Sequence, residues 1–225
     1  MFRGNRVSLL SLLQTTMTVN LIWATPDAEK MIVMMARVSA PKNQSNMDTA
    51  PKLLQYLIEN SHWSPFEMAN MCVEINTTRA IAPQILRHRS FSFQEFSQRY
   101  ADVIELGGAR VPHLRRQDNK NRQNSINDLS PDMVSTYYRR ITELFEDAEH
   151  LYREMVSNGV AKECARAVLP LSTKTRLYMN GTLRSWIHYL QLRTDNGTQL
   201  EHRQVAEDIK QIFCEQFPVI GQAVF

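Results

Sequence analysis

The chain has 225 residues, of which 43% are hydrophobic and 22% are charged. These proportions are ordinary for a globular protein and exclude bulk disorder and collagen-like repeats. A chain of this length can build a core without disulfides. The three cysteines, Cys72, Cys164 and Cys214, are too few and too scattered for a disulfide framework. They form no CxxC pair, so we expect no metal site. Free thiols in a chain of this size favour a reducing, cytoplasmic location.

The distribution of charge is more informative than its total. The formal net charge is +3, which is too small to identify a protein that binds a polyanion. The segment from Arg79 to Arg122 nevertheless holds nine Lys and Arg residues against four acids, a net +5, so the rest of the chain carries −2. A local cationic field of this kind attracts anions. It leaves open whether the anion is a nucleic acid or a small phosphate.

The N-terminus resembles a signal peptide only loosely. Arg3 and Arg6 precede a short apolar run over residues 7–13 that serines interrupt, and no small-residue cleavage site follows. No apolar run in the chain reaches the roughly 18 residues that span a bilayer. Met17 stands directly before an apolar strand pattern. We therefore expect residues 1–16 to be a dispensable extension and residues 17–225 to form a single domain.

The first half of the chain mixes strand and helix patterns. Alternation predicts strands over residues 18–24 and 71–75. Capping hydroxyls and early prolines predict helix starts. We expect a helix from Thr25-Pro26-Asp27 to about Arg37, a second opening at Asn46 or Asp48, and a third from Thr78 to about His88. Residues 91–93 are predicted to be extended, and the polar stretch 113–127 is predicted to be a loop.

The second half is mostly helical. Ser130-Pro131 should begin a long amphipathic helix that ends at Asn158-Gly159. Shorter helices are predicted over 162–168 and 183–193, and a last helix over 199–217, stopped by Pro218. Residues 174–180 are ambiguous. Because helices and strands are mixed without strict βαβ alternation, the fold class is α+β. Neither GxGxxG nor GxxxxGK[ST] occurs, so dinucleotide-fold and P-loop sites are not supported.

One block of fourteen residues, from Arg87 to Tyr100, concentrates groups that bind anions. It reads RHRSFSFQEFSQRY and holds three arginines, a histidine, three serines and a glutamate. Planar guanidinium groups suit phosphate oxygens, and serine hydroxyls can complete such a cradle. A basic, solvated loop remains the alternative on spacing alone.

This block resembles the RHRxxSxNExSxRY signature of the flavin-dependent thymidylate synthases, with Gln94 in place of the usual Asn. Further stretches are similar to segments of the same family. They are Ala36-Arg37-Val38-Ser39, His62-Trp63-Ser64-Pro65-Phe66-Glu67, Arg166-Ala167-Val168-Leu169-Pro170 and Leu183-Arg184-Ser185-Trp186, followed by Leu192-Arg193 and Gln199-Leu200-Glu201. The similarity covers roughly residues 18–217. Gly197 stands where many members have His, so we assign no contact there.

The resemblance implies a mixed fold of helices and an antiparallel-type sheet that assembles as a homotetramer with active sites at subunit junctions. It implies the reductive methylation of dUMP to dTMP, with 5,10-methylenetetrahydrofolate as carbon donor and NADPH, through FAD, as reductant. By position, FAD is expected to contact Ser39, Ser64, Arg87, His88, Arg89, Glu95, Arg184 and, one helical turn later, His188. The residues expected to hold dUMP are Gln84, Arg87, Glu95, Ser97, Gln98, Arg99, Arg166 and Arg193. His62 is expected on the folate and nicotinamide side. We expect no nucleic acid and no membrane as partners.

The chemistry of the reaction limits which residues can be catalytic. Methylating uracil at C5 requires either a covalent nucleophile at C6 or strong polarisation of the ring. No cysteine lies in the Arg87–Tyr100 block, and each is expected to be a small buried hydrophobe. Ser97 has no adjacent base, so we expect it to bind phosphate. Polarisation by Arg193 at the amide edge of the pyrimidine is then the predicted catalytic contribution.

Two other functions are kept open. A basic nucleic-acid-binding module using Arg87–Arg122 would bind DNA or RNA in a salt-sensitive way and carry no chromophore. A related enzyme of the same fold could methylate uracil in another substrate.

His113, His150 and His202 lack the spacing of metal ligands and are expected to lie at the surface or to be hydrogen-bonded.

Overall fold

The computed structural model describes residues 17–225, so the predictions for residues 1–16 lie outside it. The described residues fall into two compact units. Unit 1 comprises Met17 and residues 97–174, and unit 2 comprises residues 18–96 and 175–225. The chain passes from unit 2 to unit 1 within the Arg87–Tyr100 block, between Phe96 and Ser97. The predicted α+β class with antiparallel pairing is confirmed.

Unit 2 is built on a four-stranded sheet in the order β1-β2-β6-β3. The strands are β1 (Thr18–Ala24), β2 (Asn70–Thr78), β3 (Ser92–Glu95) and β6 (Lys174–Thr182). β1 pairs antiparallel with β2, and β3 pairs antiparallel with β6. The register of the first pair shifts between Leu21 and Trp23, which makes a bulge at Ile22. The strands predicted over 18–24 and 71–75 are confirmed, and the ambiguous stretch 174–180 is a strand.

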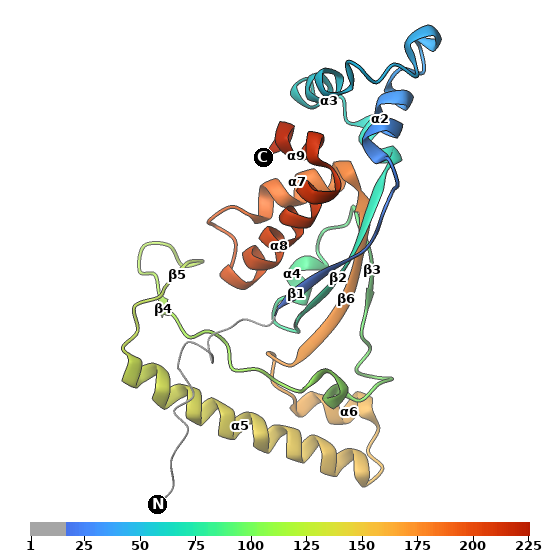
Figure 1. Cartoon of the computed structure of the whole chain (residues 1–225). Coiled ribbons are helices and arrows are strands. Elements are labelled where there is room, and N and C mark those ends of the chain that lie inside the picture. The colour runs from blue at the N-terminus through green and yellow to red at the C-terminus, as the bar shows by residue number, and fades with distance from the viewer. Residues whose placement is uncertain (1–16) are drawn as a thin grey trace, which may run out of the picture. The chain divides into compact units, whose positions relative to one another are not determined.

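Helices cover the sheet and the ends of its strands. They are α2 (Ala28–Ala36), α3 (Ala50–Glu59), α4 (Ala82–Ile85), α7 (Leu183–Arg193), α8 (Leu200–Gln216) and α9 (Pro218–Val224), with 3₁₀ turns at Pro41–Asn43 and Ser64–Met68. Figure 1 shows α7 and α8 side by side along one face of the sheet. Fully buried apolar side chains of β2, β6, α7 and α8 form the core between them. Trp186 fixes this packing by donating its Nε1–H to the carbonyl of Met71 at 2.9 Å.

Three sequence expectations for unit 2 are wrong in detail. The hydroxyl of Thr25 does not cap α2, because it accepts the backbone N–H of Asn70 instead. The helix expected from Thr78 to His88 is reduced to the single turn of α4, because β2 extends through Thr78 and the helix ends at Ile85. Pro218 ends α8 but also begins α9, since proline is well suited to the first turn of a helix.

Unit 1 is organised around one long helix, α5 (Pro131–Ser157). The predicted cap is present, because Ser130 Oγ accepts the N–H of Met133 at 3.3 Å. The helix α6 (Lys162–Ala165) and 3₁₀ turns at Val103–Leu106 and Arg166–Val168 complete the unit. Its small core consists of buried Tyr152, Val103 and Ala165 with neighbouring aliphatic side chains.

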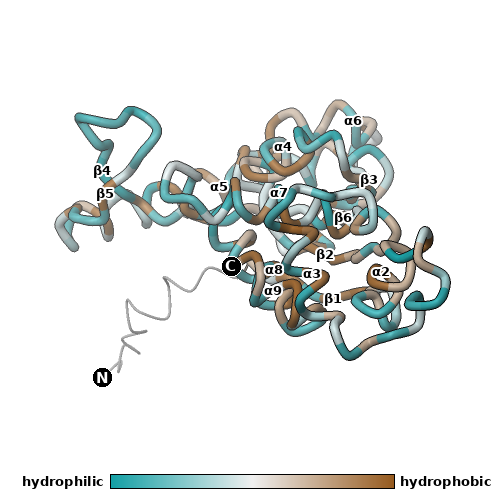
Figure 2. Tube along the Cα trace, turned by 90° about the horizontal axis from the view of Figure 1, so that it is seen from above, coloured by the Kyte–Doolittle hydropathy of each residue, from teal (hydrophilic) through white to brown (hydrophobic). Residues whose placement is uncertain are grey.

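The stretch 113–127, predicted to be a loop, contains a minimal hairpin. β4 (Arg116–Gln117) pairs with β5 (Ser125–Ile126), and Arg116 forms an ion pair with Asp128 at 2.6 Å. Figure 2 shows the turn between the two strands as a hydrophilic tube. The polarity of the hairpin explains why the alternation typical of a strand is missing from the sequence.

Two negative findings concern the described residues only. None of the helices between residues 17 and 225 is both long and apolar enough to cross a membrane. No group of three or more potential metal-ligating side chains occurs in that same range. Of the three cysteines expected to be buried, Cys72 is buried, Cys214 is partly buried, and Cys164, on α6, is exposed.

Candidate active site

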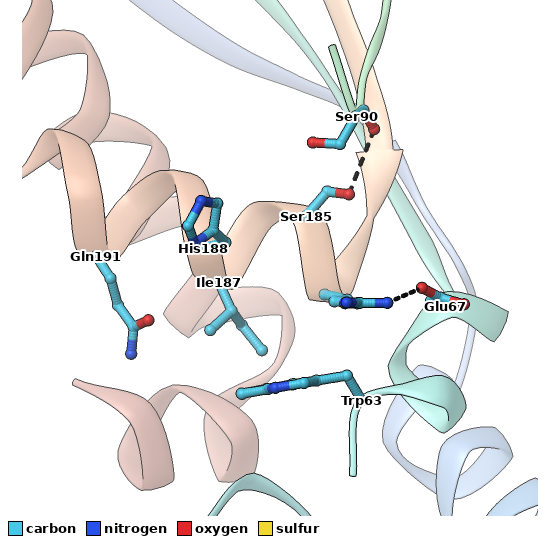
Figure 3. Close-up of a pocket in the computed structure, with 8 residues that line it drawn as sticks. Trp63, Glu67, Ser90, Ser185, Ile187, His188 and Gln191 are labelled. Carbon is cyan, nitrogen blue, oxygen red and sulfur yellow. Dashed lines mark hydrogen bonds and ion pairs between the residues drawn. The ribbon is translucent and has the colours of Figure 1, made fainter. Parts of the chain in front are cut away.

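A pocket of about 400 Å³ lies in unit 2 along one face of α7. Arg184, Ile187, His188 and Gln191 line it, at the three- and four-residue spacing that places side chains on one side of a helix. Figure 3 shows Trp63 across the pocket from Ile187. Glu67, Ser90 and Ser185 complete the lining. The pocket therefore contains two residues predicted to contact the flavin, Arg184 and His188.

Side-chain contacts hold the pocket walls together. Arg184 Nη1 pairs with Glu67 Oε1, which joins α7 to the Ser64–Met68 turn (Figure 3). Ser185 Oγ donates to the backbone carbonyl of Ser90 at 3.3 Å, which joins α7 to the segment before β3. Three stretches that the sequence singled out separately thus meet at this pocket.

His88 and Arg193 form the most specific contact among the predicted site residues. They are 105 positions apart, yet Arg193 Nε donates to His88 Nε2 at 2.9 Å. Because a guanidinium group cannot accept a hydrogen bond, Nε2 of His88 must be the unprotonated nitrogen. Neutral His88 therefore carries its proton on Nδ1. The bond leaves the two terminal nitrogens of Arg193 available for other acceptors.

Burial, and then the nearby charges of Arg193, His188 and Arg87, together lower the pKa of His88 to about 4. A neutral imidazole at physiological pH is what the bond from Arg193 requires. His88 also lies edge-on to the ring of Tyr189, with the ring centroids 4.8 Å apart. The ring of His88 is thus fixed on two sides.

Behind His88 lies a buried pair that sequence reasoning did not assign. Tyr189 Oη and His202 Nε2 are 3.0 Å apart, and both side chains are fully buried. Burial, then Arg193 and His88, lower the pKa of His202 to about 4, and burial raises the pKa of Tyr189. His202 was expected to lie at the surface or to be hydrogen-bonded, and the second description is correct. Tyr189 stands three residues after Trp186, which places both on one face of α7, but no spacing in the sequence indicates its partner His202.

Two other predicted residues in unit 2 are engaged in polar contacts. Glu95 Oε1 accepts from Arg79 Nη1 at 2.6 Å and from Thr175 Oγ1 at 2.9 Å. Gln84 donates its amide to Gln199 Oε1 at 2.7 Å. Both side chains are therefore held in fixed positions.

The predicted residues between Ser97 and Lys174 belong to unit 1. Arg99 pairs with Glu163 of α6 at 3.0 Å, and Arg166 lies one helical turn after Glu163. Ser97 is exposed, whereas Gln98 is buried and its Nε2 has no partner within residues 17–225. The residues predicted to bind dUMP are thus divided between the two units.

Other predicted residues do not line the pocket. Arg87 and Arg89 are exposed on either side of His88, Ser39 is exposed after α2, and Ser64 follows the pocket residue Trp63. His62 is exposed and contacts the ring of Tyr56 edge-on. The lining residues that sequence reasoning missed are Trp63, Glu67, Ser90, Ser185, Ile187 and Gln191. Helical spacing from Arg184 would have found Ile187 and Gln191.

The lining of the pocket fits part of a flavin cofactor. It combines an aromatic ring, a cationic guanidinium, hydroxyl groups and an amide in a volume typical of small-molecule sites. An extended aromatic heterocycle can pack against the ring, and its polar edges and phosphates can form hydrogen bonds with the guanidinium, hydroxyl and amide groups.

Comparison with known proteins agrees with this chemistry. The family model described as "Thymidylate synthase complementing protein" matches residues 20–219. A probable flavin-dependent thymidylate synthase of Paramecium bursaria Chlorella virus 1 is 51% identical over 88% of this chain and 90% of its own length. A flavin-dependent thymidylate synthase of Synechocystis sp. is 50% identical over 87% of this chain and 89% of its own length.

A solved structure has the same fold. The UMP/dUMP methylase PolB from Streptomyces cacaoi, bound with 5-Br dUMP, superposes with a TM-score of 0.82 and 30% sequence identity. The superposition covers 93% of this chain and 95% of the other. On the strength of the family match and of these relatives, the chain belongs to the flavin-dependent thymidylate synthase family.

Proposed function

We propose that this protein catalyses the reductive methylation of dUMP to dTMP. The carbon donor is 5,10-methylenetetrahydrofolate, and NADPH supplies reducing equivalents through FAD. The observation that carries the proposal is the 50–51% identity, over most of both chains, to two proteins named as flavin-dependent thymidylate synthases. The alternative of a basic nucleic-acid-binding module receives no support from any of the relatives described above.

We assign the flavin to the α7 pocket and its surroundings. Arg184 and His188 line that pocket, and His88 lies on the segment that leads to it. The other proposed flavin contacts are Ser39, Ser64, Arg87, Arg89 and Glu95. FAD, when bound, supplies the redox chemistry, and the protein supplies its position and surroundings.

We assign the substrate to two sets of residues. In unit 1, Ser97, Arg99 and Arg166 are proposed to bind the phosphate, since guanidinium and hydroxyl donors suit its oxygens. Gln98 joins them as a further dUMP contact. In unit 2, Gln84, Arg87, Glu95 and Arg193 are proposed to contact the nucleotide, and His62 to lie on the folate and nicotinamide side.

Arg193 is the proposed catalytic residue. Charge develops on the amide edge of the pyrimidine when C5 becomes nucleophilic, and a fixed guanidinium stabilises that charge. The bond to His88 fixes Arg193 through Nε and leaves its terminal nitrogens to face the substrate. His88 therefore acts by positioning Arg193.

Several organisational features are part of the same proposal. Residues 17–225 form one catalytic domain, residues 1–16 are dispensable, and the enzyme is a cytoplasmic homotetramer with active sites at subunit junctions. A chain that begins at Met17 tests the first two statements, because it should fold and retain full turnover.

The reaction is tested with purified protein, FAD, NADPH, 5,10-methylenetetrahydrofolate and dUMP, and dTMP is measured by mass spectrometry. Parallel reactions with UMP and with uracil-containing RNA separate the proposed substrate from those of a related methyltransferase. Turnover of dUMP with coupled NADPH oxidation is expected, and its absence in flavin-loaded protein refutes the proposal.

A pair of arginine variants tests the catalytic assignment. Arg193→Ala should retain the flavin absorbance and lose about 10²–10³-fold in turnover, the range for removal of a group that stabilises developing charge. Arg139→Ala, on an exposed face of α5 beside Glu143, is the matched control and should turn over normally. Normal turnover in Arg193→Ala contradicts the assignment.

A further inference from the structure

A buried polar pair joins α7 to α8, two helices that lie side by side (Figure 1). The hydroxyl of Tyr189 on α7 lies 3.0 Å from Nε2 of His202 on α8, and both side chains are fully buried. Burying a phenol and an imidazole costs free energy unless their polar atoms are paired, whereas two apolar side chains of similar shape would carry no such cost. A hydrogen bond in an apolar core does, however, restrict its members to one arrangement. The bond to His202 therefore fixes the ring of Tyr189 in one position.

The number of unpaired buried groups shows which member of the pair donates. If Tyr189 donates its O–H to Nε2, only Nδ1 of His202 is left without a partner among residues 17–225. If Nε2 donated instead, the O–H of Tyr189 would be unpaired as well, which is less favourable. Burial and the nearby charges of Arg193 and His88 lower the pKa of His202 to about 4, so the imidazole is neutral and can accept. Tyr189 is thus the donor, and His202 carries its proton on Nδ1.

The ring that this bond fixes lies directly against His88. The ring centroids of Tyr189 and His88 are 4.8 Å apart and the ring planes are nearly perpendicular, at 82°. His88 in turn accepts the hydrogen bond from Nε of Arg193 at 2.9 Å. A shift of the tyrosine ring would therefore move the imidazole of His88 and disturb its bond to Arg193. The contacts run without a gap from α8, through α7 and the segment after α4, to the guanidinium group.

We infer that Tyr189 and His202 are positioning residues for Arg193, and that they act through the ring of His88. Both are fully buried, so they set the place of the guanidinium group without lying at a surface that a substrate can reach. The inference rests on the proposed catalytic role of Arg193. Because a displacement of about 1 Å can lower turnover by about 10²-fold, we expect loss of the Tyr189 hydroxyl to lower kcat by at least about tenfold.

Turnover in two backgrounds tests whether the pair acts through Arg193. Tyr189→Phe removes the hydroxyl and keeps the ring, and it should lower kcat about tenfold while the flavin absorbance is retained. In an Arg193→Ala background the same substitution should cause no further loss, since no guanidinium group is left to position. Tyr152→Phe is the matched control, because Tyr152 is equally buried but lies in the core of unit 1. It should leave kcat unchanged in both backgrounds. An equal loss of kcat from Tyr189→Phe in both backgrounds overturns the inference.

A second set of variants separates positioning from stability. His202→Gln offers an amide oxygen that can accept the O–H of Tyr189, so it should retain most of kcat. His202→Leu leaves that hydroxyl unpaired and should lower both the free energy of unfolding and kcat. Combining Tyr189→Phe with His202→Leu leaves no unpaired polar group, so stability should recover while kcat stays about tenfold low. Recovery of kcat together with stability would show a purely structural role and overturns the inference.

Crystal structures give a readout that does not depend on turnover. In the wild type and in Tyr152→Phe, Nε of Arg193 should lie within hydrogen-bond distance of Nε2 of His88, whereas in Tyr189→Phe the two atoms should be more than about 3.5 Å apart. The double apolar variant serves in the same way if Tyr189→Phe does not fold. An intact bond in these variants overturns the inference. Failure of the flavin-loaded wild type to convert dUMP refutes the proposed reaction instead, and the crystal structures then still decide whether the pair positions Arg193.

Discussion

Lowering the pH from 6.5 to 4 should destabilise this protein through His202, which is fully buried beside Tyr189. Burial, then Arg193 and His88, lower the pKa of His202 to about 4 from an ordinary value of 6.5. In the unfolded chain the imidazole binds a proton as the pH falls through 6.5, whereas in the folded chain it stays neutral down to about 4. In this window the unfolded state binds more protons than the folded state. The free energy of unfolding therefore falls as the pH is lowered.

The size of the effect follows from the shift. Each unit of pKa difference corresponds to about 1.4 kcal/mol, so the shift of His202 corresponds to about 3 kcal/mol lost between pH 6.5 and 4. The half-buried His88 acts in the same direction with a smaller effect. Above pH 7 both groups are neutral in both states, and neither adds a slope.

The assay is urea unfolding at fixed protein concentration, followed by tryptophan fluorescence at half-unit steps of pH. His202→Gln keeps a polar group of similar size but cannot titrate. Its free energy of unfolding should fall about 3 kcal/mol less than that of the wild type between pH 6.5 and 4. Parallel curves above pH 7 are the internal control. Equal acid sensitivity of the two proteins would show that His202 is not held neutral by its surroundings.

Three further substitutions test other parts of the chain. Ser97→Ala should weaken dUMP binding and leave measurable turnover, as titration of dUMP against flavin absorbance and initial rates will show; loss of all turnover with normal affinity would favour a nucleophilic serine instead. Glu29→Ala removes the carboxylate that accepts the first backbone N–H groups of α9 at 2.8 and 2.9 Å, and should cost about 1 kcal/mol in thermal unfolding. Glu29→Gln, which keeps an acceptor, should cost less, and an equal loss would count against the capping role. Gly181→Ala would place a Cβ 2.4 Å from the ring of Phe91 and should destabilise the protein by about 1–3 kcal/mol, with partial recovery in the double variant with Phe91→Leu.

The sequence predicts an element well where local signals agree. Residues 183–193 were predicted to be helical, and α7 has these bounds, because a capping threonine precedes an amphipathic run that contains neither Gly nor Pro. The expectation for 78–88 was wrong for a local reason. Thr78 can cap a helix or end a strand. In the structure it is the last residue of β2, because the sheet extends to it.

In the candidate site, contacts within one helix could be predicted from the sequence, whereas contacts between residues far apart in the chain could not. Arg184 and His188 share a pocket because they are four residues apart on one helix, and this spacing is visible in the sequence. The bond from Arg193 to His88 joins residues 105 positions apart, and no spacing rule indicates it. The pairing of Tyr189 with His202 is equally invisible, since it depends on how α7 packs against α8.

The direct passage from β6 into α7 has a consequence for how the chain tolerates changes in length. The strand ends at Thr182 and the helix begins at Leu183, so no loop residue can absorb an insertion. One added residue at this point would rotate every later side chain of the helix by about 100°. His188 would leave the pocket, and the indole of Trp186 would turn out of the core. Insertions and deletions should therefore be far more damaging here than in the β4–β5 hairpin, whose polar residues lie outside any core.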